Sequence, residues 1–124
     1  MSALTTLSDG NRYFANSGVV FGDVTSPATI SLVTIPNTGL RDSFVIIQYS
    51  TGQIVSSGGD QLGISVKLND VEVINAQSDL REREINPETW NLFVPRQSKL
   101  EIISLNTAAN NTQNRSINLL GYYL

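Results

Sequence analysis

Short runs of alternating hydrophobic and polar residues, separated by turn-forming residues, recur along most of the chain. Alternation with a period of two places the hydrophobic side chains on one face, so each run predicts a half-buried β-strand. The predicted strands cover residues 19–24, 28–35, 43–49, 64–68, 71–74, 90–94, 99–106 and 116–124. Turn signals rich in Gly, Pro, Asn, Asp and Ser recur about every 8–12 residues, which is typical of β-sandwiches. We therefore predict an all-β, antiparallel β-sandwich of about eight short strands, with a jelly roll as the expected topology.

Two of these strands carry hydrophobic side chains on both faces. In the strand at 43–49, Phe44 and Ile46 share one face, while three odd-numbered hydrophobic residues share the other. On the last strand, Tyr122 and Tyr123 point in opposite directions, so at most one of them faces the core. A strand that is hydrophobic on both faces is either covered twice or packs against another subunit. The candidate subunit-interface residues are therefore Phe44, Val45, Ile47, Tyr49, Tyr122 and Tyr123.

The clearest local motif is a hairpin over residues 64–74. Two alternating segments flank Asn69-Asp70, and Asn and Asp tolerate the positive φ values that a two-residue type I′ turn requires. The next segment, residues 76–89, is the most charged part of the chain. A helical turn could form there, but it has no hydrophobic stripe and Pro87 limits its length. We expect a hairpin followed by a charged loop.

The length of 124 residues fits one compact domain with one core. Residues 1–18 are polar and contain two turn signals, so we interpret them as an N-terminal arm that pairs only when a partner is present. Residues 19–124 are then a single β-sandwich domain. No signal peptide is visible, and the longest hydrophobic run is far shorter than the roughly 20 residues that span a bilayer. We expect synthesis in a cytoplasm and no membrane partner.

The missing residue types exclude most catalytic chemistry. The chain has no His and no Cys, which excludes Ser-His-Asp and Cys-His nucleophiles, thiol redox chemistry and the usual zinc sites. Glu82 and Glu84 alternate with arginines, a pattern typical of a solvated charged loop rather than of two carboxylates across a cleft. Acidic residues are too dispersed to predict a calcium loop. The sequence therefore predicts neither an enzyme nor a bound cofactor.

Charge and polarity narrow the choice of partners. The net charge of −3 argues against a nucleic-acid partner, because that affinity depends on Lys and Arg at phosphates. Ser, Thr, Asn and Gln together contribute 42 residues, so amides and hydroxyls rather than charges solvate much of the surface. Weak mutual repulsion of this kind suits a protein that packs against copies of itself or against a partner.

The last third of the chain resembles small jelly-roll virion proteins of bacteriophages. The likeness rests on residues 92–102 (LFVPRQSKLEI), with a proline turn before a strand, and on residues 117–122 (INLLGY), a terminal strand with Gly-Tyr. Capsid decoration (cement) proteins and related tail or fibre modules are of this kind. The resemblance implies a non-enzymatic virion protein that stabilises the capsid as a homotrimer and is made in the host cytoplasm.

The same resemblance implies partners and attachment elements. The expected partners are further copies of this chain and the major capsid protein or another virion protein. The attachment elements would be residues 1–18 and 76–89, with Tyr13, Phe14, Arg81 and Arg83 as candidate capsid-attachment residues. An alternative is a receptor- or carbohydrate-binding module of a phage tail, fibre or adhesin, in which aromatic and amide-rich loops bind the ligand.

Overall fold

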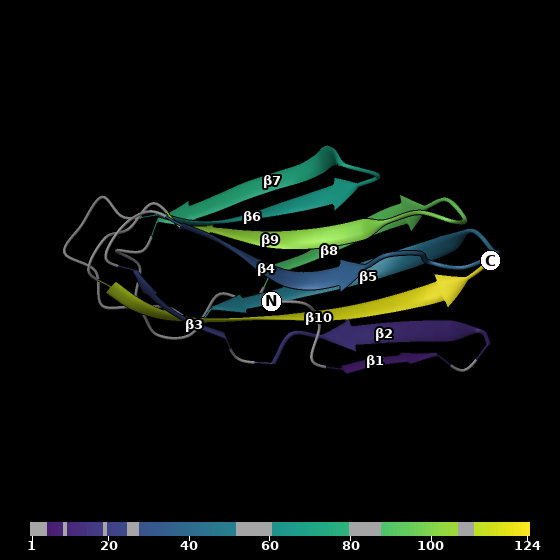
Figure 1. Ribbon diagram of the computed structural model, residues 1–124, viewed down its shortest axis with the longest axis horizontal. Helices are drawn as coiled ribbons and strands as arrows, with labels where there is room; N and C mark the ends of the chain where they lie inside the picture. Colours follow the sequence, from purple (N-terminus) through teal and green to yellow (C-terminus); the bar gives the residue numbers. More distant parts are fainter. Residues whose placement is uncertain are drawn as a thin grey trace.

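The computed structural model consists of β-strands joined by turns and describes residues 5–8, 10–18, 20–24, 28–51, 61–79, 88–106 and 111–124. Within these ranges there is no helix, and hence none long and apolar enough to cross a membrane. The strands, shown in Figure 1, are β1 (Thr5–Ser8), β2 (Arg12–Asn16), β3 (Val20–Val24), β4 (Ala28–Ile35), β5 (Ser43–Thr51), β6 (Gln61–Leu68), β7 (Val71–Asp79), β8 (Glu88–Val94), β9 (Leu100–Asn106) and β10 (Asn111–Tyr123).

The strands form two antiparallel sheets. One sheet has the order β1-β2-β10-β5-β8, and β3 pairs with β10 beyond the end of β2. The other has the order β4-β9-β6-β7. The eight expected strands correspond to β3–β10, which form two four-stranded layers, β3-β10-β5-β8 and β4-β9-β6-β7. The chain changes layer at every connection from β3 to β10 except the β6–β7 hairpin, so the predicted jelly-roll β-sandwich is confirmed.

The β6–β7 hairpin also forms as predicted. Asn69 and Asp70 have φ values of 51° and 67°, the left-handed conformation that both central residues of a type I′ turn adopt. The strands extend further than expected, because the ladder between β6 and β7 continues to the pair Gln61 and Asp79. Positions 76–79 are therefore strand rather than loop or helical turn, and so are positions 88 and 89. Residues 80–87 lie outside the described part of the chain.

The segment expected as an arm contains two strands of the larger sheet. β1 pairs with β2, and β2 pairs with β10; Figure 1 shows both along one edge of that sheet. Tyr13 and Ala15 on β2 are buried at 4% and 1% exposure. Tyr13 pairs with Gly121 on β10, and its ring occupies the space that a side chain at that position would fill. Strand β2 therefore contributes side chains to the core of the sandwich.

The core lies between the two sheets and includes inward-pointing residues of β2 and of β4 to β10. On β4 the alternation is broken by a β-bulge between Ser31 and Val33, so the consecutive residues Leu32 and Val33 are both fully buried. The largest fully buried side chains are Leu32, Val33, Ile47, Ile64, Leu100, Ile102, Ile117 and Leu119.

Hydrogen bonds hold together the loops at the end of the sandwich where β5 begins and β8 ends. The amide of Thr38 donates to the carbonyl of Ser98 (2.9 Å), and the amide of Ser98 donates back to Thr38 Oγ1 (3.2 Å). Ser98 Oγ also donates to the carbonyl of Pro95 (2.6 Å). Both polar side chains are buried and thus have partners, as buried polar groups require. This network fixes the β4–β5 loop against the β8–β9 loop.

Candidate interaction surface

The outer face of the β4-β9-β6-β7 sheet is mainly polar, with Ile103 lying between Ser31 and Ser65. Its cross-strand neighbours include Glu101 beside Lys67 and Lys67 beside Glu72. Glu72 accepts hydrogen bonds from Ser65 Oγ (2.5 Å) and from Asn75 Nδ2 (3.0 Å). Both hydrogen bonds lower the pKa of Glu72, because they stabilise its charged form, and the hydrogen bond from Ser65 has the larger effect. This face has the alternating charges of an ordinary solvated sheet.

The outer face of the other sheet is hydrophobic. Leu120 on β10 lies between Phe14 on β2 and Ile46 on β5. In the neighbouring row, Phe44 on β5 lies between Tyr122 and Phe93. The four aromatic side chains are 38% to 50% exposed, although a sheet face in contact with solvent usually carries polar residues. We call this surface the outer apolar face and define it as Phe14, Phe44, Ile46, Phe93, Leu120 and Tyr122.

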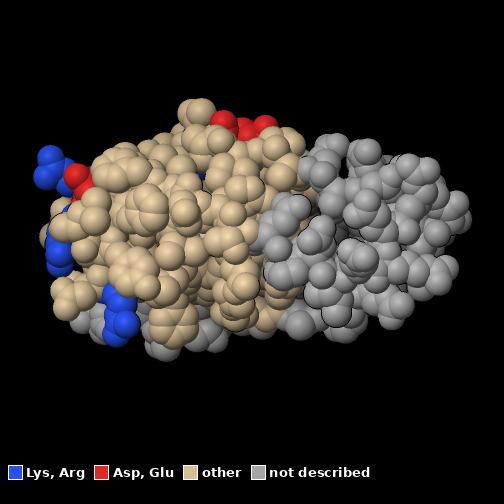
Figure 2. Space-filling view, turned by 180° about the vertical axis from the view of Figure 1, so that it is seen from behind, with Lys and Arg blue, Asp and Glu red and all other residues tan. Residues whose placement is uncertain are grey.

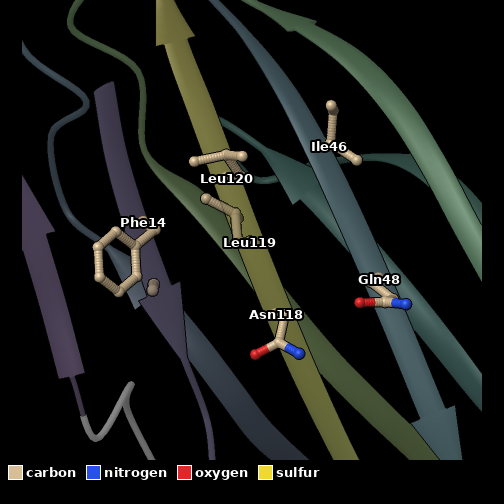
Figure 3. A pocket seen from close by; sticks show the side chains of 7 residues that line it. Phe14, Ile46, Gln48, Asn118, Leu119 and Leu120 are labelled. Atoms are coloured by element: carbon tan, nitrogen blue, oxygen red, sulfur yellow. The ribbon is translucent and has the colours of Figure 1, made fainter. Parts of the chain in front are cut away.

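A row of amides borders the outer apolar face. Asn118 on β10 lies between Asn16 on β2 and Gln48 on β5, and the side-chain amide of Asn16 donates to Asn118 Oδ1. Gln48 and Asn118 help to line an open hollow of about 340 Å³, together with Phe14, Ala15, Ile46, Leu119 and Leu120. Figure 3 shows the two amides at one end of this hollow, with the Phe14 ring to one side.

Charge is nearly absent from this surface. Among the described side chains of the outer rows of β2, β10, β5 and β8, only Arg12 is charged, and it lies at the corner beside Tyr122. Figure 2 shows where charged side chains lie on one face of the molecule: uncharged side chains cover its middle, and charged side chains lie at one end and along one edge.

Four of the predicted site residues lie in the core. Val45 and Ile47 are 0% exposed, and Tyr49 is 4% exposed, because these positions of β5 point between the sheets. Tyr13, predicted for capsid attachment, is buried in the same way. Side chains inside the sandwich do not contact a partner, so these four predicted contacts are corrected to core positions.

Of the remaining predicted residues, three lie on the surface, one packs against the core and two lie outside the described part of the chain. Tyr122 and Tyr123 point in opposite directions, as expected: Tyr122 is exposed, while Tyr123 packs against the core and donates its hydroxyl to the carbonyl of Thr38 (3.0 Å). Phe44 and Phe14, predicted for two separate contacts, lie together on the outer apolar face. Arg81 and Arg83 are outside the described residues.

Three members of the outer apolar face were not among the predicted site residues. Ile46 and Leu120 lie in one row and Phe93 in the next, and each comes from a different strand. The alternation within β5 indicates that Ile46 shares a face with Phe44, and that within β10 indicates the same for Leu120 and Tyr122, whereas β8, with Phe93, contains neither of these two aromatic residues. Strand order, which the alternation does not contain, is what joins them into one surface.

The charged groups offer little chemistry within the described ranges. No group of three or more His, Cys, Asp or Glu residues there could hold a metal ion. Lys99 Nζ contacts Asp70 Oδ1 at 3.1 Å, with both side chains well exposed, and the hydrogen bond to Asp70 raises the pKa of Lys99. Exposed pairs of this kind stabilise a turn weakly.

Three solved structures of virus particles contain a similar sandwich. For the VP2 subviral particle of infectious bursal disease virus, the TM-score is 0.66 over 98% of this chain, with 16% sequence identity. This chain shares its fold with a protein of a virus particle. The Gx strain of the same virus gives a TM-score of 0.62 over 98% of the chain at 14% identity. The T13 viral particle gives 0.58 over 90% at 14% identity.

The likeness covers only part of the viral proteins. This chain spans 33% to 35% of the length of the three matched chains, about one third. At these identities the comparison establishes the fold. No protein-family model matches the chain, and no curated protein matches it.

Proposed function

We propose that this protein is a non-enzymatic structural protein of a virion. The observation that carries the proposal is a jelly roll over almost the whole chain, similar to the fold in three structures of virus particles. The outer apolar face supports it, because proteins that assemble bury a hydrophobic face against a neighbour. The absence of His and Cys from the sequence removes the usual nucleophiles and bases of an enzyme.

Within the virion, we assign the protein to decoration of a bacteriophage capsid. This finer role derives from the resemblance of residues 92–102 and 117–122 to cement proteins, and the homotrimer stays a prediction of the same resemblance. The outer apolar face would be the contact surface, with the major capsid protein or another virion protein among its partners. A protein that binds only the assembled shell shifts the equilibrium toward assembly, and this stabilises the capsid.

The test begins with particles purified on a density gradient. Quantitative mass spectrometry is expected to find this chain in the particle fraction at a fixed ratio to the coat protein. A mild chaotrope wash should release it and leave the shells able to sediment, and adding it back should restore their heat resistance. If the chain stays in the soluble fraction at every stage, the virion role is refuted. If the wash never releases it without destroying the shell, it is a shell component rather than a decoration.

The second candidate function is binding of a glycan or receptor. It is favoured by the hollow that places Gln48 and Asn118 beside the ring of Phe14, since amides and an aromatic face are groups that can bind sugars. A glycan array, followed by titration of any hit against Gln48→Ala, tests this function. A specific sugar whose binding that substitution abolishes would favour a receptor-binding module that recognises a glycan, whereas an array without hits would refute glycan binding.

A further inference from the structure

We propose that the outer apolar face pairs with the same face of a second copy of this chain, about a two-fold axis. The inference deepens the proposed function, on which it rests, by naming a second copy as the partner of its contact surface, in a dimer rather than the homotrimer that the resemblance implies. The contrast between the two sheets motivates it. The face with Glu101, Lys67 and Glu72 is suited to water, whereas the opposite face exposes four aromatic side chains.

Two-fold pairing requires a patch that is complementary to itself. Hydrophobic contact meets this condition, because it has no direction. The amides of the bordering row meet it as well, since each carries both a donor and an acceptor and can pair with a copy of itself. A row of carboxylates or of ammonium groups would not. The chemistry of the face therefore fits a second copy without further adjustment.

The distribution of charge also favours the outer apolar face as the surface that pairs with a second copy. Each copy has a net charge of −3, so two copies repel each other on average. Among the described side chains of the outer rows of β2, β10, β5 and β8, only Arg12 is charged, and it borders the outer apolar face at the corner next to Tyr122. A two-fold axis along or across the strands separates the two Arg12 side chains, because such an axis moves each corner to a different one. Two copies therefore meet with little charge repulsion between the described side chains of this face.

The shape of the outer apolar face, which has both a hollow and exposed rings, also favours pairing with a second copy. The hollow of about 340 Å³ lies beside Phe14, and rings that are 38% and 50% exposed, those of Phe44 and Phe93, belong to the next row. Sheets that pack face to face interdigitate their side chains with strand directions within about 30° of each other. Exposed rings on one copy and a hollow on the other supply the two shapes that such packing needs.

Sedimentation equilibrium over a range of concentrations tests the pairing. The wild-type chain is expected to have the mass of a dimer at micromolar concentration. Ile46→Arg, in the middle of the face, should weaken pairing at least 100-fold, and Gln48→Arg, on the exposed amide row, should also weaken it. Thr34→Arg, on the outer face of the other sheet, is the matched control and should leave the mass unchanged. Circular dichroism and thermal melting establish that each variant is folded.

The absence of cysteine from the sequence allows a second readout. A single Asn118→Cys substitution should give a covalent dimer with a short bismaleimide, whereas Thr29→Cys, exposed on the other sheet, should not. A wild-type monomer at all concentrations would overturn the pairing, and so would a trimer or a dimer that both arginine substitutions leave intact. Particle association is measured separately: a dimer that never enters particles refutes the virion role alone, and a monomer that enters them refutes the pairing alone.

Discussion

Replacement of Gly121 by alanine should destabilise the protein, because the space for a side chain is already occupied. A Cβ atom at this position would lie 2.3 Å from Cζ of Tyr13 and 2.4 Å from its Cε1. Carbon atoms pack at about 3.5–4.0 Å, so the ring must move by about 1 Å. Its freedom to move is small, because its hydroxyl is hydrogen-bonded to Ser43 Oγ at 2.8 Å and its ring lies 5.1 Å from that of Tyr123.

The expected cost follows from these contacts. Overpacking of a core site costs about 1–3 kcal/mol, and loss of the hydrogen bond between Tyr13 and Ser43 would add about 1 kcal/mol. Alanine is intrinsically better than glycine in a strand by about 0.5–1 kcal/mol, which offsets part of this. The net loss should be about 1–3 kcal/mol. A loss of 2 kcal/mol would lower the Tm by about 8 °C for a domain of this size.

Urea denaturation of a double-mutant cycle isolates the clash. Gly121→Ala is compared in the wild-type background and in Tyr13→Val, where the ring is absent. We expect destabilisation in the first background and a neutral or slightly stabilising effect in the second, with a coupling free energy of about 1 kcal/mol or more. The reasoning fails if the substitution is neutral in the wild type, or if its cost is the same with and without the ring.

Three further predictions concern the core, the pH dependence and the hairpin. Ile47→Ala should cost about 2–5 kcal/mol in urea denaturation, because Ile47 is fully buried; a loss below about 1 kcal/mol would contradict its core position. Burial raises the pKa of Tyr13 above the ordinary 10.0, so its contribution to stability is present below that pH and is lost as the pH rises through the raised pKa. Tyr13→Phe should therefore show a smaller loss of stability above pH 10 than the wild type, and parallel curves would refute this assignment. Asn69→Ala should cost about 1–2 kcal/mol, because it removes the acceptor of the Lys99 amide (2.9 Å) at a positive φ; Asn69→Gly, which relieves the backbone, should cost less.

The outer apolar face combines residues that the sequence assigns to different roles. Phe14 is predicted for capsid attachment and Phe44 for a subunit contact, yet both lie on one continuous sheet face. The two predicted contacts, with the capsid and with another subunit, therefore fall on the same surface. The effect of Ile46→Arg on self-association and on particle binding, each measured separately, then shows which of the two uses this surface.

Short-range patterns in the sequence determined the faces of individual strands, the hairpin and the all-β class of this protein. Alternation determined which residues of the strand at 43–49 share a face, because side chains in a strand alternate whatever the strand packs against. The turn residues Asn69 and Asp70 determined the hairpin, because the turn conformation depends on those two residues and their neighbours. The all-β class followed from the same short-range signals.

Only the tertiary structure decided which face of each strand became core. Both faces of β5 are hydrophobic, so nothing local distinguishes Val45 from Phe44; the second sheet covers one and leaves the other exposed. The place of β2 was likewise decided at long range, by the fit of Tyr13 against Gly121. Strand order depends on contacts between segments that are far apart in the sequence, so no short segment contains it.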